Sequence, residues 1–328
     1  MNALMNREQS ARHERRQDVG WGEPSPVRTR TPLQRPSVLL ATGVLALISA
    51  AVVIGPMWLS YGYDQTDLDL GLSPPSLSNG HYLGTDILGR DLLARLLYGG
   101  RISLLVALVA TVISTVIGTL YGALSGYFGG RVDDVMMRMV DLLFSLPYLF
   151  LVLVLMALFA EPEVVDPVIR LLRWHPEGAW AEWLRGPGVR MVLLFVALGA
   201  VSWLTLARIV RGQVLALKNE LFVEAARAAG AGTWHILFRH LIPNASGPIL
   251  AYTVLTIPSV MLQEAFISFL GLGIQAPQAS WGTLVHDGVE AMSVAPWLFI
   301  FPAGTMVLVL FCFHVVGEAL REAWERRA

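Results

Sequence analysis

The sequence has few charged residues, one lysine and one cysteine. Of its 328 residues, 15% are charged and 55% are hydrophobic, and the mean hydropathy is +0.57. A soluble domain carries about 25% charged residues, so this composition excludes a soluble domain of this size. Cys312 lies inside an apolar run, and a single cysteine excludes a disulfide within the chain and a cysteine-based metal site. The net charge of −1, with scattered basic residues, argues against a nucleic-acid partner.

Motifs for nucleotide binding and hydrolysis are also missing. Lys218 is the sole lysine, and no GxxxxGK[ST] phosphate loop surrounds it. Neither an HExxH nor a GxSxG motif occurs, which argues against a membrane-embedded hydrolase. His286 and Glu290 have no third ligand nearby, so we expect a surface histidine there and no metal site. We therefore expect no catalytic residue and no cofactor on this chain.

Apolar runs recur at about the 20-residue length that crosses a bilayer as a helix. They predict an all-α, polytopic membrane protein with six transmembrane helices. Residues 1–36 are rich in arginine and interrupted by prolines, which predicts a disordered tail. A secretory signal is excluded because the basic region is too long and the apolar run after it spans a membrane. The predicted spans are 37–60, 102–124, 135–159, 191–210, 248–270 and 297–316.

Basic residues near the spans predict the orientation, because they concentrate on the cytoplasmic side. The tail 1–36 holds seven arginines and residues 208–244 hold five basic residues, whereas the connection 61–100 holds two. We therefore expect both termini, including the tail 319–328, and the loop 211–246 between the fourth and fifth helices to be cytoplasmic. The connection 61–100 would then face outward. The segment 161–190, with four arginines on the predicted outer side, runs against this rule.

The most polar stretch between the fourth and fifth spans is NELFVEAARAAGAGTWHILFRHLIPN, residues 219–244. Asn219 is a suitable helix cap, and Gly230 and Gly232 are suited to end a helix. Thr233 would start a second short helix that Pro243 ends. The pattern predicts a helix, a glycine turn and a helix, although an alanine-rich surface helix is ordinary in itself. The small face that would let another protein approach consists of Ala225, Ala226, Ala228 and Ala229.

The order of residues in this stretch resembles the EAA loop of the binding-protein-dependent ABC importer permeases. Glu224-Ala225-Ala226 is followed by Gly230 and then by the sequence HLIPN. In that family the loop is a cytoplasmic coupling helix that seats in a groove of the ATPase subunit. The residues that the resemblance assigns to ATPase coupling are Glu224, Ala225, Ala226, Arg227, Gly230, His240, Pro243 and Asn244.

The resemblance extends from about residue 39 to the end of the chain and is strongest to the peptide-importer permeases of the family. HYLGTD and GRDLL at 81–93, SFLGLG at 268–273 and GEALREA at 317–323 resemble motifs of that branch. The C-type permease subunits of oligopeptide importers are the most similar, over residues 118–137 and 201–213. Two features depart from the family: Glu318-Ala319 replaces its usual aspartate-glycine, and 161–188 resembles an insertion.

The resemblance implies a permease subunit of an ATP-driven importer in the inner membrane of a bacterium, with oligopeptides as cargo. Its partners would be a second permease subunit, two ATPase subunits that bind ATP and magnesium, and an external peptide-binding protein. Dipeptides, nickel or another small solute remain alternative cargoes. A self-sufficient secondary transporter is less favoured, because the sequence shows no convincing inverted repeat.

Some residues within or near the predicted spans are candidates for packing or pathway roles. Gly118, Gly122 and Gly126 follow each other at four-residue spacing, which predicts close helix packing, although glycine is also tolerated in lipid. Asp141 and Glu264 are acids at places where a charge is costly and usually faces protein or water. Their pattern leaves a pathway role and a helix-pairing role open.

Overall fold

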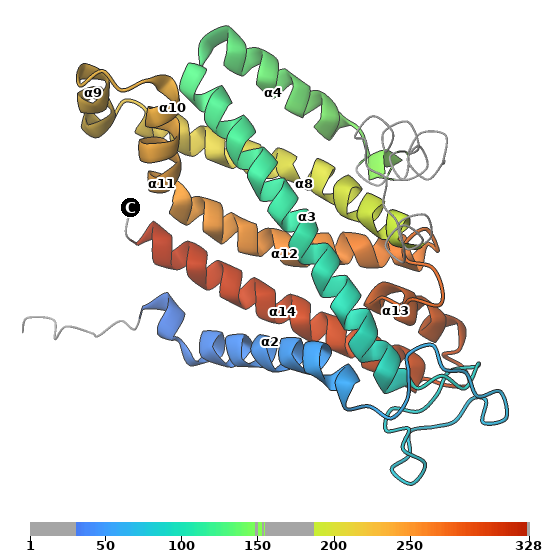
Figure 1. The fold of residues 1–328 in the computed structure, drawn as a ribbon. Helices are drawn as coiled ribbons and strands as arrows, with labels where there is room; N and C mark the ends of the chain where they lie inside the picture. Colours follow the sequence, from blue (N-terminus) through green and yellow to red (C-terminus); the bar gives the residue numbers. More distant parts are fainter. Residues whose placement is uncertain (1–30, 148–149, 153, 155–186, 327–328) are drawn as a thin grey trace, which may run out of the picture.

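The computed structural model describes residues 31–147, 150–152, 154 and 187–326 (Figure 1). The described residues are helical apart from the connections and hold no β-strand; Thr85 and Asp91 form one isolated bridge. Most of the predicted tail 1–36 and most of the segment 161–190 lie outside the described residues. The helices are η1 Pro32–Gln34, α2 Pro36–Ile54, η2 Gly55–Met57, α3 Leu92–Phe128, α4 Gly130–Ser145, α8 Pro187–Leu217, α9 Leu221–Ala228, α10 Thr233–His235, η3 Ile236–Leu241, α11 Ile242–Asn244, α12 Ser246–Phe269, α13 Trp281–Glu290 and α14 Trp297–Glu325.

In the described ranges, five helices are long and apolar enough to cross a membrane, which confirms the all-α polytopic class. The third predicted span, 135–159, extends into residues that the structure does not describe, so the count of six stays a prediction. α4 ends at Ser145, because Leu146 is extended before Pro147, as a residue preceding proline prefers. The five helices are Pro36–Met57, Leu92–Phe128, Leu194–Leu217, Ser246–Phe269 and Trp297–Glu325.

Four of these helices, α2, α14, α12 and α8, lie side by side in this order, and α3 crosses them diagonally (Figure 1). The start of α2, the end of α14 and the loop α9–α11 lie at one end of the bundle, called here the loop end. Arg35 and Glu322 form an ion pair there at 2.8 Å, which joins the first and last spans. The connection after α2 and helix α13 lie at the opposite end, called here the motif end.

Three glycines of α3 bring this helix unusually close to α8. A Cβ added at Gly118 would lie 2.9 Å from the Cβ of Leu206, and one at Gly126 would lie 2.9 Å from the carbonyl oxygen of Arg211. At Gly122 a Cβ would overlap the carbonyl oxygen of Ala207. Any larger side chain on this stripe would push the two helices apart. Because α8 leads directly into the loop α9–α11, the stripe ties α3 to that loop.

Helix α3 begins at Leu92, well before the predicted start of the span, because Asp91 caps it. The Asp91 carboxylate accepts a hydrogen bond from the Ala94 N–H at 2.7 Å. Its other oxygen lies 2.8 Å from Nδ1 of the buried His81. The sequence motif HYLGTD is therefore folded back against the first turn of α3.

A buried ionic cluster holds the motif end together. The Arg95 guanidinium, 4% exposed as a residue, donates to Asp86 at 2.6 Å and to Asp287 of α13 at 3.2 Å. Arg90 also donates to Asp86, at 2.7 Å. A guanidinium is buried at acceptable cost only when carboxylates pair with it in this way.

Helix α13, between the fifth and sixth predicted spans, was not expected from the sequence. Ser280 caps it in a capping box with Thr283, a local S-x-x-T signal that was available in the sequence. Trp281 is 1% exposed, and its indole N–H donates to the carbonyl of Leu96 at 3.0 Å. Its burial depends on a contact with α3, which periodicity alone does not reveal.

Candidate coupling site

The glycine turn after α9 is a complete Schellman motif. Gly230 has φ of +83°, a conformation that favours glycine, and its N–H donates to the carbonyl of Arg227 at 2.9 Å. The Ala231 N–H donates to the carbonyl of Ala226 at 3.0 Å. The N-cap lies one residue later than predicted: Glu220 occupies it instead of Asn219, and the helix begins at Leu221. The predicted helix–glycine turn arrangement is therefore confirmed.

The second half of the loop differs from the prediction. The chain is helical from Thr233 through η3 and α11, and Pro243 does not end it. Pro243 instead occupies a first-turn position of α11, where a missing N–H is tolerated, and α12 begins at Ser246. This segment therefore leads directly into a membrane-spanning helix.

Apolar side chains fasten the loop to the bundle. Val223 of α9 is fully buried, and Ile236, Leu237 and Leu241 of η3 are at most 1% exposed. They pack in one cluster with Val210 and other residues of α8. Burying side chains of this size is worth about 1.5–3 kcal/mol each, so the loop is held as one body with α8 and α12.

The structure brings four of the eight predicted coupling residues into one hollow. Ala225, Ala226, Gly230 and His240 line a cavity of about 730 Å³, together with Phe222, Ala229, Ala231, Gly232 and His235. Glu224, Arg227, Pro243 and Asn244 are exposed outside this lining. Phe222 and His235 were not predicted as site residues. His235, five residues before His240, puts its ring 5.5 Å from the ring of His240.

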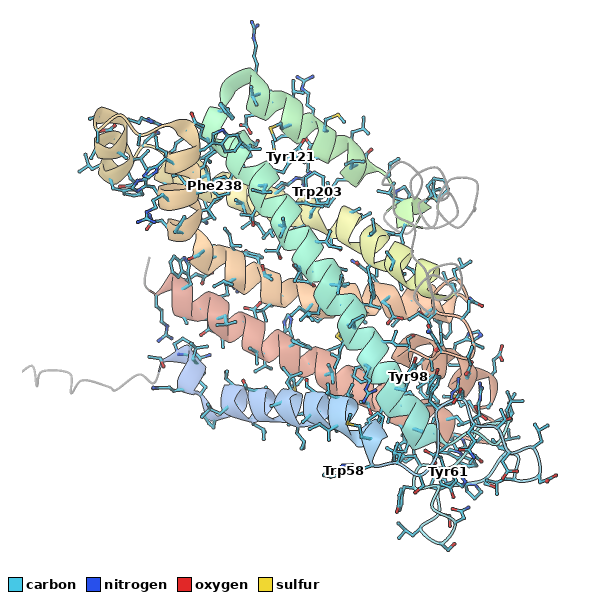
Figure 2. All side chains as sticks on the ribbon, viewed as in Figure 1. Trp58, Tyr61, Tyr98, Tyr121, Trp203 and Phe238 are labelled. Atoms are coloured by element: carbon cyan, nitrogen blue, oxygen red, sulfur yellow. The ribbon has the colours of Figure 1, made fainter. Side chains whose placement is uncertain are left out.

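Several large apolar side chains of the loop α9–α11 are exposed at the loop end. Leu221 is 80% exposed, Trp234 62% and Phe238 53%, and Figure 2 shows Phe238 at that end of the bundle. An exposed apolar patch beside a hollow is typical of a protein–protein contact. At the motif end, Figure 2 shows Trp58 and Tyr61, of which Trp58 is 86% exposed, as expected for aromatic residues at a membrane interface.

A charged cluster joins α3, α4 and α8 just before the loop. Arg211 forms a two-pronged ion pair with Asp133, with both N–O distances at 2.5 Å. This hydrogen bonding to Arg211 holds the pKa of Asp133 below its ordinary value, with Ser125 contributing in the same direction. The Lys218 ammonium donates to the carbonyl of Gly126 at 2.9 Å, near the C-terminal end of α3. The three helices therefore share one rigid base.

The two acids singled out in the sequence lie in different surroundings. Asp141 of α4 is exposed and forms an ion pair with Arg208 of α8 at 2.7 Å. Glu264 of α12 is 1% exposed and accepts hydrogen bonds from Ser103 at 3.1 Å and from Ser268 at 2.7 Å. Both acids thus contact other protein groups, Asp141 at the surface and Glu264 in the interior.

Comparison with known proteins connects this architecture to a transport family. The family described as "binding-protein-dependent transport system inner membrane component" matches residues 118–326, which include α4, the loop α9–α11 and the last two spans. The chain therefore belongs to this family of inner-membrane transport components and is a multi-pass membrane protein. The resemblance inferred from the loop sequence is confirmed.

Individual relatives are permease proteins of peptide transport systems. The chain is 47% identical over 280 residues to the oligopeptide transport system permease protein OppC of Escherichia coli (strain K12), covering 85% of this chain and 83% of that protein. It is 39% identical to OppC of Bacillus subtilis (strain 168), covering 85% and 82%. It is also 39% identical to the dipeptide transport system permease protein DppC of that organism, covering 85% and 78%.

Proposed function

We propose that this chain is one permease subunit of an ATP-driven importer that moves oligopeptides across the cytoplasmic membrane. The observation that carries the proposal is the loop α9–α11, an exposed hollow that is fused to two membrane-spanning helices. The similarity of the chain to OppC proteins over most of their length supports a peptide as the cargo.

A peptide does not cross hydrocarbon unaided, because its backbone N–H and C=O groups would lose their hydrogen bonds to water. A transporter must therefore supply a polar route and an energy source. The chain carries no phosphate-binding loop of the GxxxxGK[ST] type, so in this proposal the energy comes from a partner. Two ATPase subunits bind ATP and magnesium, hydrolyse the ATP and move the loop.

In the proposed complex the loop seats in a groove of an ATPase subunit, and the surface around Ala225, Ala226 and His240 contacts that groove. Closure of the ATPase pair moves the loop relative to the membrane, and α8 and α12 move with it as rigid bodies. A second permease subunit completes the route, and an external binding protein delivers the peptide. The loop end, with the start of α2 and the end of α14, then faces the cytoplasm.

The similarity to DppC supports dipeptides as a second candidate cargo. The test is peptide uptake by proteoliposomes that contain the complete complex. The binding protein is supplied on the outer face of the complex, and ATP is supplied on the side of the ATPase subunits. The proposal expects ATP-dependent accumulation of peptides of several residues. Accumulation of dipeptides alone would favour the second candidate, and accumulation of neither would refute a peptide importer.

A further inference from the structure

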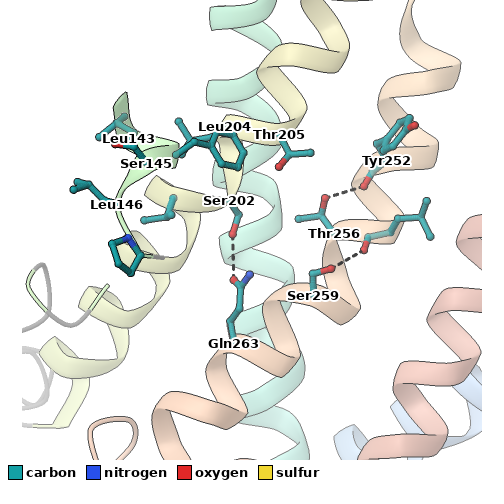
Figure 3. Close-up of a pocket in the computed structure, with 14 residues that line it drawn as sticks. Leu143, Ser145, Leu146, Ser202, Leu204, Thr205, Tyr252, Thr256, Ser259 and Gln263 are labelled. Carbon is teal, nitrogen blue, oxygen red and sulfur yellow. Dashed lines mark hydrogen bonds between the residues drawn. The ribbon is translucent and has the colours of Figure 1, made fainter. Parts of the chain in front are cut away.

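A second cavity, also of about 730 Å³, lies between α4, α8 and α12 (Figure 3). Its volume is in the range of pockets that hold small organic ligands. Among the residues that the structure describes, no side chain of the lining carries a charge. Its polar side chains are Ser145 of α4, Ser202 and Thr205 of α8, and Tyr252, Thr256, Ser259 and Gln263 of α12.

This cavity lies midway along its two membrane-spanning helices. Thr205 is near the midpoint of the span Leu194–Leu217, and Thr256 is near the midpoint of the span Ser246–Phe269. Hydroxyl and amide groups at this depth have no bulk water or lipid headgroups to bind. Polar side chains placed there face protein or an aqueous route, and this cluster faces a cavity.

The hydroxyl groups of Thr256 and Ser259 donate their hydrogens to backbone carbonyls of α12 itself. Thr256 donates to the carbonyl of Tyr252 at 2.8 Å, and Ser259 donates to the carbonyl of Leu255 at 3.4 Å (Figure 3). Each hydroxyl oxygen keeps lone pairs and can accept a further hydrogen bond. These two positions of the wall therefore offer acceptors, which suit an N–H donor.

In the described part of the chain, an ion pair lies close to the cavity but outside its lining. Asp141 and Arg208, roughly one helical turn from the lining residues Ser145 and Thr205, bind each other at 2.7 Å and are not part of the lining. A charged wall would retain substrate side chains of opposite charge and repel those of like charge. A neutral wall in which Thr256 and Ser259 offer acceptors instead suits a group that peptides share, the backbone N–H.

We propose that the cavity between α4, α8 and α12 is a binding site for an extended segment of the transported peptide. Thr256 and Ser259 accept hydrogen bonds from its backbone N–H groups, and the site does not discriminate by side-chain charge. This inference rests on the proposed function and names the surface at which that function handles its substrate.

Trapping during turnover tests the location of the site. Cys312 is buried and is the chain's one cysteine, so Cys312→Ala provides a background in which Ser259→Cys is the only thiol of this chain. The probe is a peptide whose cysteine carries a 2-thiopyridyl disulfide, offered to the complete complex with ATP. The matched control is Leu250→Cys, which is 62% exposed on the same helix but outside the lining.

The site predicts at least a tenfold higher yield of the peptide adduct at position 259 than at position 250, and only with ATP. Equal yields, no adduct at either position, or an adduct of Ser259→Cys to the second permease subunit instead of the peptide would overturn the inference. The Cys312→Ala complex is assayed for peptide uptake in parallel. If the native complex, assayed alongside, shows no peptide uptake, the proposed function itself is refuted. Normal uptake without the peptide adduct refutes only the site.

Charge selectivity gives a second readout. Thr205 is exposed and lies in the lining, so Thr205→Asp places a carboxylate on the wall and Thr205→Asn is its neutral control. We compare uptake of a lysine-rich and a glutamate-rich peptide of equal length, each at saturating binding protein. The ratio is expected to be near one for the native chain and the control, and to rise at least fivefold toward the lysine-rich peptide in Thr205→Asp. An unchanged ratio in Thr205→Asp would show that substrate does not meet this wall.

Discussion

Replacement of Gly230 tests whether the shape of the loop transmits the ATPase's movement. Its φ of +83° is outside the range of proline, which is fixed near −65°, and proline also lacks the N–H that donates to Arg227. Gly230→Pro therefore cannot form the Schellman turn. We expect the complex to assemble and hydrolyse ATP but to lose peptide uptake almost completely.

Alanine at the same position gives a graded effect. A Cβ at Gly230 would meet no atom within 4 Å, so the cost is only that of the left-handed backbone, about 1–2 kcal/mol. That energy lowers the ratio of chains with the Schellman turn formed to chains without it about 5- to 30-fold. Gly212 of α8 is the matched control: a Cβ there also meets no atom within 4 Å, and its φ is not positive, so Gly212→Ala should leave coupling unchanged.

The assay is peptide accumulated per ATP hydrolysed in proteoliposomes that hold the complete complex. The expected order is Gly212→Ala equal to the native chain, Gly230→Ala lower, and Gly230→Pro near zero. Normal coupling in Gly230→Pro, or equal losses in the two alanine variants, would refute the reasoning that the turn geometry carries the coupling.

Further substitutions test the packing and the ionic clusters. Gly122→Ala should lower the unfolding temperature in detergent, because its Cβ would overlap the carbonyl of Ala207, with a cost of about 1–3 kcal/mol, whereas Gly212→Ala, with no atom within 4 Å, should not. Asp86→Asn should cost about 3 kcal/mol because it removes the main carboxylate beside a buried guanidinium, and the exposed Asp69→Asn should be neutral. Because the pKa of Asp133 is lowered, its stabilising effect is full above the ordinary aspartate pKa of about 3.9 and is lost as pH falls through the lower folded value. Thermal unfolding measured from pH 6 to pH 3 should show this loss in the native chain and not in Asp133→Asn.

Local chemistry made the loop predictable from sequence. Three local signals within about 15 residues define the loop: the run of helix-forming residues at 221–229 predicts a helix, Gly230 a turn, and Thr233 a new helix. Each signal acts on its immediate neighbours in the sequence. The membrane spans were predictable for the same reason, since length and hydropathy are local. Pro243 misled the prediction, because proline ends a helix only when it does not fall in the first turn of the next one.

Features that depend on distant contacts were not predictable. His235 and Phe222 were not predicted as site residues, because only the fold brings them beside His240 in one hollow. The polar wall of the second cavity combines Thr205 and Ser259, which are far apart in sequence on two helices. Single Ser and Thr residues in apolar helices are common, so only the pairing of α8 with α12 gives them significance.

Reconstitution with and without the ATPase subunits tests the central claim most directly. Proteoliposomes that contain this chain and its permease partner, with binding protein, peptide and ATP, should show no accumulation. Addition of the two ATPase subunits should start it. Accumulation of peptide against a gradient before the ATPase subunits are added would contradict the account, because the chain would then draw its energy from another source.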